Sequence, residues 1–113
     1  MELPGHGAIR YIEEILQDPS TKSVRTFGFL SHVSGNTFTA EFRDRRLQVD
    51  ASLLGEQLVI KDGSLYMMIG EVETSEDRPT LRVRVARNVD GMDLNLFDAA
   101  LSVRRKFEAE LKA

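Results

Sequence analysis

Five short segments of the chain have the apolar pattern of β-strands and are bounded by turn residues. The alternation is clearest in the second segment, where Phe38, Ala40 and Phe42 fall on one side and polar residues fall on the other. The chain is therefore predicted to form a small, mostly β structure, with strands at residues 24–30, 37–43, 46–50, 64–69 and 81–87.

The last predicted strand alternates apolar and basic residues, which indicates one buried side and one side that faces solvent. This pattern predicts that Leu81, Val83 and Val85 point inward, whereas Arg82 and Arg84 point outward. Outward arginines are either solvated or available to phosphate groups, so this strand is a candidate nucleic-acid contact.

The connections between the strands indicate a particular kind of barrel. Gly28, inside the first strand, predicts a bend or a close approach of two backbones. Residues 52–58 are predicted to include a helical turn, and the polar residues 73–79 are predicted to form a loop. Five strands, an interior glycine and an insertion after the third strand suggest the oligonucleotide/oligosaccharide-binding (OB) barrel, although the pattern also fits other small barrels.

Helical spacing appears at both ends of the chain. Residues 8–17 carry apolar residues at helical spacing before Asp18 and Pro19 break the pattern, which predicts a short helix or an ordered arm. A long helix is predicted from Asp93, a plausible N-cap, to Lys112. The fold class is thus all-β with flanking helices, in one domain composed of an arm (1–22), a barrel (23–90) and a C-terminal helix (93–112).

The predicted C-terminal helix has two lines of apolar residues instead of one. The shorter line contains Leu94, Phe97 and Leu101. Together the two lines cover about half of the helix circumference, which is wider than one docking surface usually requires. Either the barrel buries both lines, or the short line caps the barrel and the long line meets a helix of another chain. The long line consists of Leu96, Ala100, Val103, Phe107 and Leu111.

Composition restricts the class of protein. The chain has 113 residues and no cysteine, so disulfide frameworks and thiolate chemistry are excluded. Its apolar runs are far shorter than the roughly 20 residues that cross a bilayer, and its first residues lack the pattern of a secretory signal. We expect an intracellular soluble domain with no membrane partner. The net charge of −3 argues against strong autonomous binding to nucleic acid.

Little in the sequence points to catalysis. His6 and His32 are the two histidines, and they are too distant in sequence for a zinc motif. No phosphate-binding glycine loop follows a strand, and no serine can be paired with a histidine and an acid. We therefore expect no catalytic residue, no metal and no cofactor. The candidate nucleic-acid-binding residues are Arg25, Arg82 and Arg84.

Three segments resemble a known family. They are residues 24–28, residues 63–71 and the junction from Ala86 to Leu96, which contains Val-Asp-Gly-Met-Asp-Leu. These segments are similar to the Ten subunit of the CST (Cdc/Stn/Ten) telomere complex, and the junction is the most specific of them. The resemblance covers roughly residues 24–112, whereas residues 32–60 match only in general layout.

The resemblance implies an OB fold without catalytic activity. It also implies a heterodimer with the Stn subunit, formed through the C-terminal helix and the barrel, inside a complex with a large subunit. Such a complex would bind single-stranded telomeric DNA in the nucleus, protect chromosome ends on telomeric chromatin and support C-strand fill-in by DNA polymerase α–primase. Carried onto this chain, the partner surface would include Met92, Leu96, Ala100, Val103, Arg104, Phe107 and Leu111.

Two alternatives remain open on the sequence. One is the small OB subunit of replication protein A or of another genome-maintenance complex, against which the junction at residues 88–96 argues. The other is a free-standing OB module that binds single-stranded nucleic acid by itself. Tight, steeply salt-dependent binding by the isolated chain would favour this module.

Overall fold

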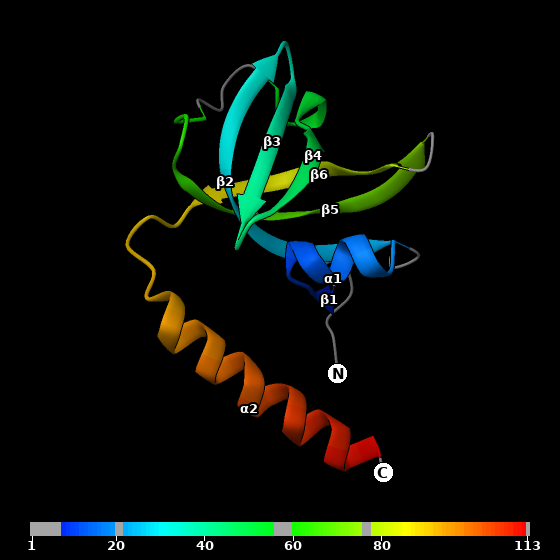
Figure 1. Cartoon of the computed structure of the whole chain (residues 1–113), viewed down its shortest axis with the longest axis vertical. Helices are drawn as coiled ribbons and strands as arrows, with labels where there is room; N and C mark the ends of the chain where they lie inside the picture. Colours follow the sequence, from blue (N-terminus) through cyan, green and yellow to red (C-terminus); the bar gives the residue numbers. More distant parts are fainter. Residues whose placement is uncertain (1–7, 20–21, 56–59, 76–77, 113) are drawn as a thin grey trace.

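A computed structural model describes residues 8–19, 22–55, 60–75 and 78–112 of the chain. Five strands form the predicted barrel, and helices lie outside it (Figure 1). The strand order β2-β3-β4-β6-β5 returns to β2, because β2 pairs with both β3 and β5. The strands are β2 (Ser23–Ser34), β3 (Thr37–Phe42), β4 (Arg45–Asp50), β5 (Leu65–Ser75) and β6 (Arg78–Asn88).

The closure of the barrel is uneven. Four of the five junctions are antiparallel, whereas β4 and β6 run parallel and pair only from Gln48 to Asp50 on β4. The interior is filled by alternate side chains of all five strands, as the alternation predicted. These buried residues include Val24, Leu30, Ala40, Phe42, Leu47, Val49, Tyr66, Met68, Leu81 and Val83.

The N-terminal segment differs from its prediction as a single helix or arm. Residues Ala8–Ile9 form a short strand, β1, which pairs in parallel with β2, and α1 (Ile12–Gln17) follows. The Arg10 backbone N–H continues this pairing by donating to the Arg25 carbonyl at 2.9 Å, so the chain stays extended until Tyr11. Two isoleucines of α1 then close one end of the barrel core.

The predicted polar loop at residues 73–79 is wrong. β5 continues to Ser75 and β6 already begins at Arg78, so the two strands form a long hairpin. Cross-strand pairing explains the extension: Glu73 lies opposite Thr80, and its carboxylate is 3.5 Å from the Arg82 guanidinium. Polar composition indicated a loop, but a solvated hairpin accepts polar residues on both of its faces.

The inward position predicted for Val85 is also wrong, because its side chain is 46% exposed. The β5–β6 register shifts between Ile69 and Gly70, so one extra residue enters β6 and reverses the alternation beyond it. Gly70 permits this bulge. A Cβ atom at this position would lie 2.2 Å from the Arg82 carbonyl oxygen.

The remaining elements agree with the sequence. Gly28 makes the predicted close approach, since a Cβ atom there would lie 3.0 Å from the Ala40 Cβ. The insertion forms a 3-10 turn, η1 (Ser52–Leu54), and residues 56–58 of the predicted turn lie outside the described residues. The C-terminal helix is α2 (Leu94–Lys112), and the Asp93 carboxylate caps it by accepting the Leu96 N–H at 3.0 Å. Among the described helices, none combines the length and the apolarity needed to span a membrane.

Candidate partner and nucleic-acid surfaces

The short apolar line of α2 packs against the barrel. Leu101 is 6% exposed, and Leu94 packs on the hydrophobic core from the partly buried first turn. The Phe97 ring lies edge-on to the Phe27 ring of β2, with centroids 4.6 Å apart, and also edge-on to the Tyr11 ring. These contacts hold the first half of α2 beside the barrel, in agreement with the alternative in which the short line caps the barrel.

The long apolar line of α2 faces solvent in this single chain. Its large side chains are among the most exposed hydrophobic residues of the described structure, and Ala100 between them is exposed too. In Figure 1 the second half of α2 runs away from the five-stranded barrel. The exposed fractions are 68% for Leu96, 70% for Val103, 60% for Phe107 and 70% for Leu111.

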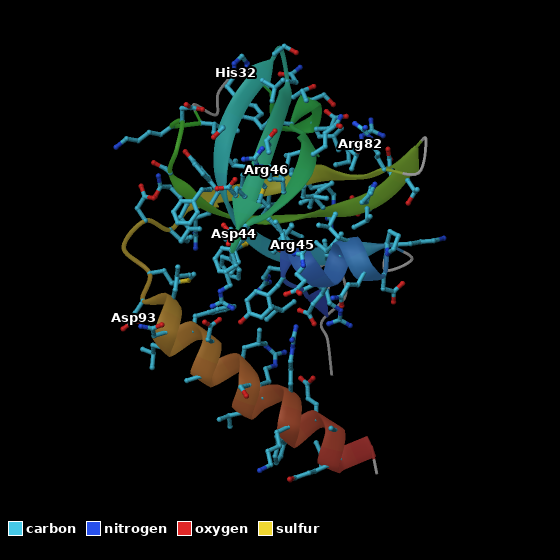
Figure 2. The ribbon with its side chains drawn as sticks, viewed as in Figure 1. His32, Asp44, Arg45, Arg46, Arg82 and Asp93 are labelled. Atoms are coloured by element: carbon cyan, nitrogen blue, oxygen red, sulfur yellow. The ribbon has the colours of Figure 1, made fainter. Side chains whose placement is uncertain are left out.

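Met92 and Arg104, the other two predicted partner residues, flank this line. Met92 lies in the turn before α2, is partly buried, and donates its N–H to the Val89 carbonyl at 2.9 Å. Arg104 is exposed on α2, where its guanidinium contacts the Glu108 carboxylate at 3.1 Å. All seven predicted partner residues thus lie along α2 or just before it. Asp93, labelled in Figure 2, marks the position where the helix starts.

A polar cluster that the sequence analysis missed fixes the other side of α2. The Tyr11 hydroxyl donates to Asp98 at 2.5 Å, and the Arg43 guanidinium forms an ion pair with the same carboxylate. The Arg43 guanidinium also lies over the rings of Tyr11 and Phe42, 5.2 and 4.9 Å from their centroids. Arg43 belongs to the two-residue β3–β4 turn and has a left-handed φ of 51°.

A second cluster lies about two turns further along α2. Arg105 donates to both carboxylate oxygens of Glu14, at 2.9 and 3.1 Å, and to the Ile9 carbonyl at 2.8 Å. Glu14 in turn accepts the Tyr11 backbone N–H at 2.9 Å. The N-terminal segment, the barrel and α2 are therefore joined by hydrogen bonds from side chains that are distant in sequence, which explains why no local pattern reveals them.

These contacts shift three pKa values. Burial, and then the hydrogen bond to Asp98, raise the pKa of Tyr11 to about 12. The same hydrogen bond, with help from Arg43, lowers the pKa of Asp98. Burial by itself would raise the pKa of Glu14, but the hydrogen bonds from Arg105 and Tyr11 and the Arg105 charge outweigh it, so the pKa falls below its ordinary value.

The three candidate nucleic-acid-binding arginines come from β2 and β6, the two strands that flank β5. Arg25 projects outward from β2, opposite Ile69 of β5. Arg84 on β6 contacts Glu71 at 2.9 Å, and Arg82 is engaged with a β5 carboxylate as described above. Because β5 supplies acidic partners, this side of the barrel is mixed in charge.

The structure also locates the histidines considered for chemistry. His32 is exposed at the end of β2, where its Nε2 lies 3.0 Å from the Gly35 carbonyl oxygen and its backbone N–H donates to Asp62 at 2.7 Å (Figure 2). His6 lies outside the described residues. Within the described ranges, no three histidine, aspartate or glutamate side chains gather in a group that would hold a metal ion.

Comparisons with known proteins agree with this architecture. Residues 3–111 match the model of a family described as "Telomere-capping, CST complex subunit" (Ten1_2). The human CST complex subunit TEN1 is 32% identical over 100 residues, which cover 83% of this chain and 81% of the human protein. The Arabidopsis thaliana subunit TEN1 is 40% identical over 50 residues, or 42% of this chain, and this match spans only 39% of that relative.

A solved structure shares the fold. A chain in the crystal structure of the S. pombe Stn1–Ten1 complex superimposes with a TM-score of 0.75 at 13% identity, covering 92% of this chain and 96% of that one. The likeness supports the closed barrel with its C-terminal helix as an OB fold. Since the family model spans nearly all of the sequence, the chain belongs to the Ten1 family of telomere-capping CST complex subunits.

Proposed function

We propose that this chain is a non-catalytic OB subunit that pairs directly with an Stn-type subunit, through α2 and the adjoining barrel surface. In this proposal the pair joins the large CST subunit at telomeres in the nucleus. The assembled complex binds single-stranded telomeric DNA, protects chromosome ends and supports C-strand fill-in by DNA polymerase α–primase. The observation that carries the proposal is the row of exposed apolar side chains along α2.

The energetics of this row favour a protein partner. Burying a large apolar side chain such as Phe107 or Leu111 contributes about 1.5–3 kcal/mol, so four such residues supply a substantial share of a stable interface. They follow helical spacing along one side of α2, which suits packing against a second helix or a hydrophobic groove. A related fold occurs in a structure described as a complex of Stn1 with Ten1, which supports an Stn-type partner.

Two residues at the border of the row have separate roles in this proposal. Arg104, paired with Glu108, lies beside the apolar line and places a charge at the rim of the interface. Met92, in the turn before α2, adds an adaptable apolar contact where the helix meets the barrel. Rim charges change association rates and partner choice more than affinity, so we expect Arg104 to contribute less than Phe107.

Arg25, Arg82 and Arg84 are proposed as auxiliary contacts to single-stranded DNA in the assembled complex. Glu71 and Glu73 partly neutralise the two β6 arginines, and the whole chain has a net charge of −3. Both facts favour weak binding by this subunit alone, with most of the DNA affinity supplied by other subunits. This proposal differs from the free-standing module, which requires tight autonomous binding.

The decisive experiment is co-expression of the chain with an Stn-type subunit, followed by size-exclusion chromatography with light scattering. We expect a one-to-one complex with the unmodified chain and none with Phe107→Glu, because the new charge would be buried without a partner. The matched control is Ser102→Glu, which places the same charge on an exposed position of α2 outside the long apolar line. A Phe107→Glu complex as stable as the control complex would refute the proposed interface.

A further inference from the structure

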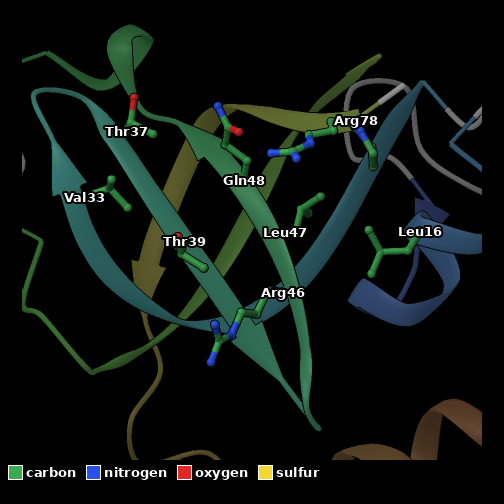
Figure 3. Close-up of a pocket in the computed structure, with 9 residues that line it drawn as sticks. Leu16, Val33, Thr37, Thr39, Arg46, Leu47, Gln48 and Arg78 are labelled. Atoms are coloured by element: carbon green, nitrogen blue, oxygen red, sulfur yellow. The ribbon is translucent and has the colours of Figure 1, made fainter. Parts of the chain in front are cut away.

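The barrel is held least extensively between β4 and β6, which pair over three residues each and diverge before them. These strands pair from Gln48 to Asp50 and from Thr80 to Arg82, but not before those positions. Ahead of this pairing, the two strands line a cavity of about 410 Å³ together with β2, β3 and α1 (Figure 3). This volume falls within the range of about 300–1,000 Å³ that is typical of ligand-binding pockets.

The cavity has an aliphatic wall. Leu16 of α1 and Val33 at the end of β2 border it and remain 37% and 58% exposed, although both are large hydrophobic residues. Leu47 forms the buried floor, and Pro79 lies at the start of β6. Figure 3 shows Leu16 and Leu47 on neighbouring sides of the same space. An aliphatic side chain from a ligand would therefore find contacts on several sides.

The polar part of the cavity is cationic. Arg46 and Arg78 line it, and the other described polar lining residues are Thr37, Thr39 and Gln48, so none of the lining residues within the described ranges is acidic. In Figure 3 the Arg78 side chain extends across the opening toward Gln48. Arg46 is already 2.9 Å from the Glu41 carboxylate, which leaves Arg78 as the main cation for an acidic ligand.

The lining favours a peptide over a nucleic acid. Surfaces that bind single-stranded DNA or RNA stack bases on aromatic side chains, and the lining residues that the structure describes include no aromatic side chain. Thr37, Thr39 and Gln48 supply hydroxyl and amide groups that match the backbone of an extended peptide.

We propose that the cavity between β4 and the β5–β6 hairpin binds an acidic, aliphatic peptide segment of a partner protein. The ligand places aliphatic side chains against Leu16 at one end of the cavity and Val33 at the other, and one carboxylate on Arg78. This surface consists of strand and α1 residues, whereas the proposed Stn-facing row lies on α2. The two sites can therefore be tested separately.

The test uses the whole chain and a fluorescein-labelled peptide of about ten residues that alternates leucine and aspartate. Binding is measured by fluorescence anisotropy and located by amide chemical shifts in ¹⁵N-labelled protein. The comparison probes are the same peptide with lysine in place of aspartate, and an oligothymidylate of about 15 nucleotides. The variants are Arg78→Glu and Val33→Asp, with Arg87→Glu and Leu53→Asp as controls at exposed positions outside the cavity.

We expect the acidic peptide to shift the amides of Thr37, Thr39 and Gln48. Arg78→Glu and Val33→Asp should each weaken its affinity by about tenfold or more, and the control variants by less than about twofold. Preference for the lysine peptide, shifts confined to α2, or absence of binding would overturn the proposal. Tighter binding of the oligothymidylate at the same amides would also overturn it and assign the cavity to single-stranded nucleic acid.

Discussion

The Tyr11 hydroxyl donates a 2.5 Å hydrogen bond to the Asp98 carboxylate, 87 residues further along the chain. This contact joins the residue before α1 to the first half of α2, and Arg43 of the β3–β4 turn binds the same carboxylate. The position of α2 is therefore determined jointly by aromatic packing and by a partly exposed ionic network.

The Tyr11–Asp98 hydrogen bond should be measurable as a coupling energy. We expect a double-mutant cycle with Tyr11→Phe and Asp98→Ala to give about 1 kcal/mol, because hydrogen bonds to charged groups are stronger than neutral ones but this one is partly exposed. Urea unfolding of the four proteins at neutral pH provides the measurement. Strict additivity of the two substitutions would contradict a direct contact.

The same contact predicts an unusual tyrosine titration. The pKa of Tyr11 is raised to about 12 by burial and by Asp98, so the neutral phenol is favoured in the folded protein. Its contribution to stability should be complete below the ordinary tyrosine pKa of about 10 and should be lost as the pH rises through about 12. Subtracting the tyrosinate absorbance of Tyr11→Phe from that of the unmodified protein isolates this group. A midpoint near the ordinary value would contradict the network.

Acid should weaken the Arg105–Glu14 contact. The pKa of Glu14 is lowered in the folded chain, so the carboxylate stabilises the fold above its ordinary pKa of about 4 and this contribution disappears as the pH falls through the lowered value. We expect Glu14→Gln to cost about 1 kcal/mol at pH 7, since the pair is partly exposed. The cost should vanish at the acidic end of a pH series of unfolding free energies, whereas a cost independent of pH would exclude an ionic role.

Gly70 should be intolerant of any side chain. A Cβ atom would lie 2.2 Å from the Arg82 carbonyl oxygen, so Gly70→Ala must displace β6 at its bulge and should cost at least about 2 kcal/mol. Gly91→Ala is the matched control, because a Cβ atom there meets nothing within 4 Å. Thermal and urea unfolding distinguish the two, and an equally mild effect of both substitutions would argue against the close approach.

Truncating a side chain should lower the unfolding free energy of the isolated chain on the buried side of α2 much more than on its exposed side. Leu101→Ala removes a buried contact with the barrel and should lower the unfolding free energy of the isolated chain by about 2 kcal/mol. Val103→Ala acts on an exposed side chain and should change that stability by less than about 0.5 kcal/mol, while weakening the proposed heterodimer. Equal losses in the isolated chain would mean that α2 buries both lines by itself.

Periodic features were predictable from the sequence because they depend on local spacing. The alternation of Phe38, Ala40 and Phe42 located a strand, and the two lines of α2 anticipated which side packs on the barrel. The exposure of Val85 was not predictable, since a one-residue bulge reverses the alternation of buried and exposed residues without any change of composition. The β5–β6 hairpin beyond Glu73 was missed because Glu73, Thr74 and Arg78 are polar and exposed, as residues of a loop would be.

The ionic network around α2 could not be predicted from the sequence for a different reason. Tyr11, Arg43 and Asp98 come from three segments, and their proximity depends on barrel closure and helix placement. The cavity residues Arg46 and Arg78 were overlooked as well, because Arg78 fell in a stretch interpreted as a loop. Arg82 and Arg84 were predicted as nucleic-acid contacts because they alternate with apolar residues along β6. In the structure they form ion pairs with Glu73 and Glu71 of β5.

The solvent-exposed second half of α2 also bears on how much of this protein a cell retains. Phe107 and Leu111 present the kind of apolar surface that chaperones and proteases use to identify unassembled chains. In the proposed complex a partner masks that surface, so assembly lengthens the lifetime of the chain. The amount of this chain that a cell retains then follows the amount of its partner, because chains without a partner keep the apolar surface of α2 exposed.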